Sequence, residues 1–149
     1  MQTTLIILTP DAVQRGLMGQ VISRFEAKGL QIVAAKFIKV APAVAKEHYA
    51  EHAGKPFFNS LIEFITSTPV MVLAVRGREA VAACRKMIGS TDGAAAEPGT
   101  IRGDFGISKS LNLVHGSDSP QSAERELGLW FRRDEILDWQ RTSEAWISA

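Results

Sequence analysis

The sequence predicts an α+β fold: a four-stranded antiparallel sheet of the ferredoxin-like type, with helices packed on one face of it. Short apolar runs rich in β-branched residues alternate with segments whose apolar residues recur at helical spacing. The resulting order is strand, helix, strand, helices, strand, helix, strand, helix, which suits a sandwich of one sheet and its helices. With 149 residues, of which 46% are hydrophobic, we expect residues 1–149 to form a single domain.

The expected strands are short apolar runs that end at proline, glycine or a polar turn. They cover residues 3–8, 30–40, 69–75 and 112–115. The third is apolar throughout, so it should be buried on both faces of the sheet. The expected helices begin after Asp11, near Pro42, near Phe58, near Glu79 and at Pro120.

Capping residues predict where the first and last helices begin and end. Asp11 should cap the first helix, and Gly29 should end it. Ser119 followed by Pro120 is a favourable helix start, because Ser accepts a hydrogen bond as cap and Pro fits the first turn. Gly128 should stop this last helix after Leu127.

Two segments lack clear periodicity. Residues 89–106 are long for a structureless loop in a compact domain, and Arg102 within them favours a functional loop over a disordered one. The tail, residues 129–149, contains all the tryptophans of the chain, and we expect them to anchor it to the body of the domain. These tryptophans are Trp130, Trp139 and Trp146.

Composition excludes several classes of protein. A net charge of +1 does not provide the positive field of a duplex-binding domain, so we expect no specific nucleic-acid partner. No apolar stretch approaches the length of a membrane span, and the N-terminus lacks the basic region of a signal peptide. The single cysteine, Cys84, cannot form an internal disulfide and should be a buried thiol. We expect a soluble, cytoplasmic protein.

Three histidines are candidates for chemistry. His48 and His52 are four residues apart, which suits a metal in principle, but we expect both on a solvated helix face and predict no metal ligands in the protein. His115 precedes Gly116 and Ser117, at a strand-to-helix junction with little bulk. A neutral imidazole is a competent nucleophile because its unperturbed pKa is about 6.5. A histidine hydrogen-bonded by local hydroxyls is the alternative interpretation.

Arg85, Thr91 and Arg102 are candidate phosphate ligands, since a guanidinium group matches phosphate oxygens and stays charged. Taken singly, each is better explained as a surface residue or an ion-pair partner. Neither of the glycine-rich phosphate loops, GxxxxGK[ST] and GxGxxG, occurs in the chain.

Residues 112–119 read Asn-Leu-Val-His-Gly-Ser-Asp-Ser, and residues 98–105 read Pro-Gly-Thr-Ile-Arg-Gly-Asp-Phe. These two motifs resemble the NxxHGSDS signature and the PGTIRGDF loop of the nucleoside diphosphate kinase family. Shorter matches follow in the family's order and spacing, at residues 11–16, 48–49, 56–58 and 126–131.

This resemblance implies an enzyme that moves the terminal phosphate of ATP, GTP or another nucleoside triphosphate onto a nucleoside diphosphate. The phosphate would pass through a phosphohistidine on Nδ1 of His115, and Mg²⁺ would bridge the nucleotide phosphates. The other residues with implied catalytic roles are Glu126, Ser117 and Tyr49. The residues with implied nucleotide-binding roles are Phe57, Arg85, Thr91, Arg102, Asn112 and Thr9. The resemblance also implies a homo-oligomer, either a hexamer or a tetramer.

The chain departs from the family's pattern at Thr9. The family motif is Lys-Pro-Asp, and its lysine helps to bind the transferred phosphate, whereas Thr9 can donate only a neutral hydrogen bond. Further departures are residues 92–93, Asp-Gly, and 109–111, Lys-Ser-Leu, where Lys109 could partly replace the lost charge. The alternative function is therefore a nucleotide-binding regulatory or scaffold paralogue, with catalysis weakened by Thr9.

Overall fold

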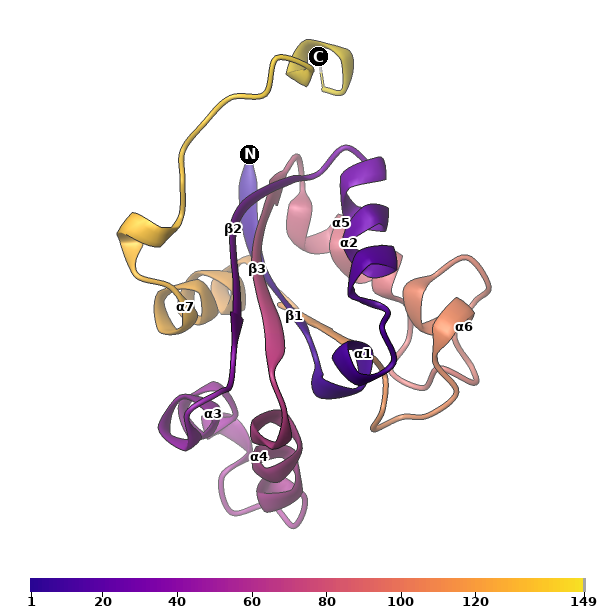
Figure 1. Cartoon of the computed structure of the whole chain (residues 1–149), viewed down its shortest axis with the longest axis vertical. Helices are drawn as coiled ribbons and strands as arrows, with labels where there is room; N and C mark the ends of the chain where they lie inside the picture. Colours follow the sequence, from indigo (N-terminus) through magenta and orange to yellow (C-terminus); the bar gives the residue numbers. More distant parts are fainter. Residues whose placement is uncertain (149) are drawn as a thin grey trace.

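A four-stranded antiparallel sheet forms the centre of the computed structural model, which describes residues 1–148 (Figure 1). The strands are β1 (Gln2–Leu8), β2 (Gln31–Ile38), β3 (Val70–Gly77) and β4 (Val114–Gly116). Their spatial order is β2-β3-β1-β4, and every neighbouring pair is antiparallel. The helices are α1 (Pro10–Gln14), α2 (Met18–Ala27), α3 (Pro42–His48), α4 (Phe58–Ser67), α5 (Ala80–Ile88), α6 (Ile101–Phe105) and α7 (Pro120–Trp130). The predicted α+β, ferredoxin-like class is confirmed.

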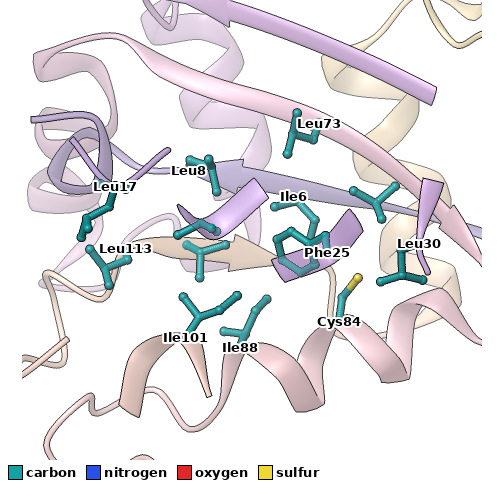
Figure 2. Close-up of a cluster of buried hydrophobic side chains, with 14 of the residues drawn as sticks. Ile6, Leu8, Leu17, Phe25, Leu30, Leu73, Cys84, Ile88, Ile101 and Leu113 are labelled. Carbon is teal, nitrogen blue, oxygen red and sulfur yellow. The ribbon is translucent and has the colours of Figure 1, made fainter. Parts of the chain in front are cut away.

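Helices cover both faces of this sheet, so the prediction that they occupy one face was wrong. The reason is that β1 is apolar on both sides, with all of residues 5–8 fully buried. Ile6 and Leu8 face a core shared with α1, α2, α5 and α6, shown in Figure 2. Leu5 and Ile7 face a second core, shared with α3, α4 and α7. The strand β3 also contributes to both cores, as its uniformly apolar sequence predicted.

Cys84 of α5 is 1% exposed and packs in the first core, which confirms the predicted buried thiol (Figure 2). Burial raises the pKa of the Cys84 thiol to about 12, because a thiolate loses its hydration there.

The segment after β1 forms two helices, α1 and α2, where a single helix was expected. Gly16 separates them with a left-handed φ of 68°. Asp11 lies inside α1 and does not cap it. Its carboxylate instead accepts hydrogen bonds from the Leu113 N–H at 2.9 Å and from the Thr9 hydroxyl at 2.6 Å. The predicted end of the helical segment at Gly29 is confirmed, since α2 stops just before it.

The last strand begins at Val114, two residues later than predicted. Leu113 has a φ of 74°, a left-handed conformation that a residue with a branched side chain rarely adopts and that cannot continue a strand. The Asp11 carboxylate holds its N–H, and its carbonyl accepts from the Thr9 N–H at 3.0 Å. This bend leads the chain into β4, where His115 pairs with Ile7 of β1.

Two helix predictions near the C-terminal half also need correction. The stretch 89–106 contains α6, which Thr100 caps by accepting a hydrogen bond from the Gly103 N–H. In α7 the predicted Ser119 cap is confirmed, but the helix continues through Gly128 as far as Trp130. Trp130 is 3% exposed, so burial of its indole in the second core stabilises the extra turn.

The tail after α7 is attached by polar contacts more than by its tryptophans. Trp139 and Trp146 are 46% and 91% exposed, so the prediction that they anchor the tail was wrong for both side chains. The Trp139 carbonyl accepts from the side chains of Gln31 and Arg76 at 3.0 and 2.6 Å. Ala149, which the predicted tail and domain include, lies outside the described residues.

We expect Asp11→Ala to lower the free energy of unfolding by about 2 kcal/mol, because a carboxylate that accepts from a backbone N–H is lost beside the left-handed Leu113. Urea unfolding at pH 7 measures the change. Asp134→Ala is the matched control: its side chain is 75% exposed, and its loss should cost less than about 0.5 kcal/mol. Equal losses in the two variants would contradict a bracing role for Asp11.

Candidate active site

His115 projects from β4 with its imidazole held by Glu126 of α7. The His115 Nε2 and Glu126 Oε1 atoms are 2.8 Å apart, and Glu126 is 7% exposed. Burial alone would raise the pKa of Glu126, but the hydrogen bond and charge of His115, together with the Ser117 bond, outweigh it and lower that pKa. An ionised carboxylate can only accept, so the His115 proton is assigned to Nε2. The lone pair of His115 is therefore on Nδ1.

The residues that follow His115 fix this geometry. Ser117 is 1% exposed, and its hydroxyl donates to the same Glu126 oxygen at 2.8 Å. Between them, a Cβ on Gly116 would lie 2.7 Å from Ile88 Cδ1, so a larger residue would require the end of that buried side chain to move. The small residue after His115, noted in the sequence, thus allows close packing on the core.

His48 is buried against His115, contrary to the prediction of a solvated helix face. It is 4% exposed, and the two ring centroids are 4.7 Å apart at an interplanar angle of 80°. Burial and the neighbouring charge of His115 lower the pKa of His48 to about 3. Ala45 is also buried and lies three residues earlier on the same side of α3, which is the one sequence signal that could have indicated burial.

A cavity of about 240 Å³ opens beside His115. It brings together four of the predicted site residues and several that the sequence did not indicate. Its lining consists of His48, Tyr49, Glu51, His52, Arg85, His115, Gly116, Asp118, Ser122, Arg125 and Glu126. Burial and the charge of Glu126 raise the pKa of Tyr49 to about 12, so its phenol stays a neutral donor. Arg85 supplies positive charge and donates to the Gly116 carbonyl at 3.2 Å.

Arg102 is not among the residues that line this cavity. It is 5% exposed and donates from Nε, Nη1 and Nη2 to the carbonyls of Asn112, Gly89 and Val114 at 3.1, 3.3 and 2.7 Å. Burial and the nearby charge of Arg85 lower the pKa of Arg102 to about 10, which still leaves it charged. Arg102 therefore joins the loop after α5 to the start of β4.

Three more of the predicted nucleotide-binding residues, Asn112, Thr91 and Thr9, do not line the cavity. Asn112 donates from Nδ2 to the carbonyls of Thr91 and Lys109 at 3.1 and 2.8 Å, and this ties the two loops together. Thr91 is exposed. Thr9 is 6% exposed, and its hydroxyl donates to Asp11.

Phe57 does not line the cavity but lies next to one of its lining residues. It is 46% exposed, and its ring centroid lies 5.3 Å from that of His52, which lines the cavity. The Lys55 ammonium lies 5.8 Å from the Phe57 ring centroid. An exposed aromatic face beside a basic group suits a stacked base next to phosphates.

The side chains of His48, His115 and Glu126 offer ligand atoms within 4.8 Å of one another, as a metal site would. Their hydrogen bonds argue against that use. Trp130 donates from Nε1 to His48 Nδ1 at 3.0 Å, so neutral His48 bears its proton on Nε2 and cannot ligate there. The His115 and Glu126 atoms already bind each other. The cluster therefore suits orientation of an imidazole better than coordination of an ion.

An imidazole with a free Nδ1, beside an arginine in a cavity, is the kind of site that transfers phosphoryl groups through a covalent intermediate. The family model described as nucleoside diphosphate kinase matches residues 2–136. Proteins of Archaeoglobus fulgidus and Staphylococcus epidermidis named nucleoside diphosphate kinase are each 52% identical over 147 residues, which is 99% of this chain and 97% and 99% of theirs. The solved structure of a halophilic nucleoside diphosphate kinase from Halobacterium salinarum in complex with CDP superposes with a TM-score of 0.97, at 45% identity, over 99% of both chains. The chain belongs to the nucleoside diphosphate kinase family, as its motifs predicted.

The buried state of His48 predicts a pH dependence of stability. Its pKa is about 3 in the folded protein and 6.5 when exposed, so below pH 6.5 the unfolded chain binds a proton that the native state does not. Stability should therefore fall as pH is lowered from 6.5 toward 3. Between pH 7 and pH 5 the loss from His48 should be about 2 kcal/mol. Urea unfolding at both pH values and one protein concentration measures it.

The matched variants are His48→Asn and His52→Asn. Asparagine at residue 48 removes the titrating group, so the loss between pH 7 and pH 5 should shrink by about 2 kcal/mol. The wild-type dependence should persist in His52→Asn, because that ring is partly exposed. A pH dependence in His48→Asn identical to that of the wild type would show that His48 is not the group responsible.

Proposed function

We propose that the chain transfers the terminal phosphoryl group of a nucleoside triphosphate to a nucleoside diphosphate through phosphorylated His115. The observation that supports this most directly is the 2.8 Å bond from His115 Nε2 to Glu126, which leaves Nδ1 as the nucleophile beside the cavity. The names of the relatives at 52% identity agree with this activity.

The reaction proceeds in two mirrored halves. The Nδ1 lone pair of His115 forms a bond to the terminal phosphorus, the bond from phosphorus to the bridging oxygen breaks, and the diphosphate leaves with that electron pair. The Nε2 proton stays between His115 and Glu126, whose carboxylate stabilises the positive charge that develops on the ring. A second diphosphate then attacks the phosphohistidine through its terminal oxygen, and His115 is restored.

Ser117 and Tyr49 assist in this proposal. Ser117 fixes the Glu126 oxygen that receives the His115 proton. The neutral Tyr49 phenol lines the cavity and is available to donate to the transferred group.

The nucleotide is held by residues around the cavity. Arg85 binds phosphate, joined by Thr91 and by Arg102, whose guanidinium has five N–H donors and spends three on carbonyls. Asn112 binds the ribose. The base stacks on the exposed ring of Phe57, and stacking fits any base, so ATP, GTP and other nucleotides are all substrates.

Mg²⁺ would be held mainly by the nucleotide phosphates, and it would supply charge neutralisation during the transfer. The cavity fits this role through Asp118, an exposed carboxylate in its lining, because Mg²⁺ prefers oxygen ligands and retains water. The buried imidazole of His48 is unsuited to it. We therefore assign no dedicated protein ligand set for Mg²⁺.

The alternative of a regulatory or scaffold paralogue rests on Thr9 alone. The comparisons offer no support for it, since relatives at about half identity over nearly the whole chain are named as kinases. The orienting contacts among His115, Glu126 and Ser117 are also present.

We also propose where the enzyme is located and how it assembles. We expect residues 1–149 to act as one domain in the cytoplasm, and to assemble as a hexamer or a tetramer. Aromatic side chains left exposed on the edge strand β2 and on the tail, Phe37 and Trp146, support an assembly that covers them. Within residues 1–148, none of the helices is both long and apolar enough to cross a bilayer.

Incubation with [γ-³²P]ATP and Mg²⁺ should label the protein at His115, because a phosphorylated imidazole nitrogen is the proposed intermediate. The label should be stable in base, lost in acid, and discharged by a second diphosphate such as dTDP. His115→Ala should abolish it, with Ser148→Ala as a matched control far along the chain. Label that persists in His115→Ala would exclude this residue as the acceptor.

Replacing Thr9 with lysine should raise kcat/KM for ATP on the order of tenfold, because a charged donor is added for the transferred phosphate. The gain is limited because Arg85 and Arg102 already provide charge, and because the bond from Thr9 to Asp11 is lost. Thr9→Val removes the same bond without adding charge, so it isolates the electrostatic gain. Steady-state kinetics at equal Mg²⁺ and ionic strength measure both, and no gain in Thr9→Lys over Thr9→Val would mean that another cation compensates.

A further inference from the structure

His48 is held by α7 through both its ring and its backbone. Its Nδ1 accepts from the indole N–H of Trp130 at 3.0 Å, and the two rings lie 5.4 Å apart at 77°. Its carbonyl accepts from Arg125 at 3.1 Å. Both partners belong to α7, the helix that also provides Glu126. Backbone and ring of His48 are therefore fixed to the same element that orients His115.

The bond to Glu126 does not by itself define the plane of the His115 ring. A single hydrogen bond at Nε2 restrains that atom but leaves the ring able to tilt by rotation about its Cβ–Cγ bond, which would displace Nδ1. The ring of His48 stands at 80° to that of His115 with centroids 4.7 Å apart. This edge-to-face contact is a preferred geometry for planar rings and blocks the tilt.

We propose that His48 is a positioning residue for phosphoryl transfer, which uses its ring, locked by Trp130, to hold the His115 imidazole in the plane that aims Nδ1 at the cavity. This inference rests on the proposed function, because it assigns a role in the same reaction. His48 contacts the ring of His115, and this contact is separate from the bond between His115 and Glu126.

The charge state of His48 suits this role. Five titratable or charged groups face His48. They are His115 from β4, Glu126 and Arg125 from α7, and Tyr49 and His52 from the residues just after α3. Only Glu126 favours a charged His48, and burial with the remaining charges outweighs it. A neutral His48 keeps the Trp130 bond, since protonation would place a second donor at Nδ1.

Two variants separate the ring from its hydrogen bond. His48→Asn keeps an acceptor for Trp130 but has no ring against His115, whereas His48→Phe keeps a ring and has no acceptor. The rate of a single turnover, transfer of ³²P from [γ-³²P]ATP to the protein, is measured at saturating ATP with the apparent Kd for ATP. We expect His48→Asn to be slower on the order of tenfold, with Kd changed less than about twofold, since misplacement of a reacting atom acts on rate. His48→Phe should recover part of that rate, because it restores a ring against His115 without the Trp130 bond that locks it.

Imidazole ¹⁵N NMR of the protein provides a readout independent of activity. In the wild type, His48 and His115 should each appear as a single Nε2–H tautomer. In His48→Asn the His115 signals should broaden because the ring tilts, while the Glu126 bond keeps the proton on Nε2, and in His48→Phe they should remain sharp. A His115 signal unchanged in His48→Asn, or equal rates in wild type and His48→Asn, would overturn the positioning role. The two proposals can fail separately. If the His115 signals respond to His48→Asn as expected but the wild type takes up no label, the proposed function is refuted while the orientation of His115 by His48 stands.

Discussion

The position of β4 depends on the contact between the Asp11 carboxylate and the backbone of Leu113. A left-handed residue with a branched side chain is unfavourable by itself, and here two elements hold it: Asp11 at its N–H and Thr9 at its carbonyl. Leu113 turns the chain sharply, so the next three residues, 114–116, pair with β1. His115 is the middle one of the three. The candidate nucleophile is therefore set by a helix more than a hundred residues earlier in the chain.

Around this bend, buried polar groups do most of the positioning. Arg102 satisfies three carbonyls that the irregular backbone leaves free, and Asn112 joins the loops on either side. A buried carbonyl without a partner is costly, so these donors stabilise a loop that has little regular structure of its own.

Much of the fold followed from the sequence, because strands and long helices have their own periodicity. The residues of β1 and β3 were found from apolar runs, and the start of α7 from its cap. The failures have physical causes. Asp11 was assigned to a cap because capping is local, whereas its real partner, Leu113, is distant in sequence. The extra turn of α7 depends on burial of Trp130, which overrides the glycine before it. For the site, His115 was identified through motifs, but His48 was placed in solvent because helical spacing shows which residues share a face and not what covers that face.

Cys84 has a consequence for how the molecule can be studied. It is the only cysteine of the chain, it lies in the core between α5 and the sheet, and its thiol is kept protonated by burial. A thiol in that state reacts neither with oxidants nor with alkylating reagents while the core is closed. Its modification therefore requires α5 to separate from the sheet, and the rate of that reaction under native conditions reports the opening of this core. Cys84 is therefore a natural probe of local unfolding that needs no introduced label.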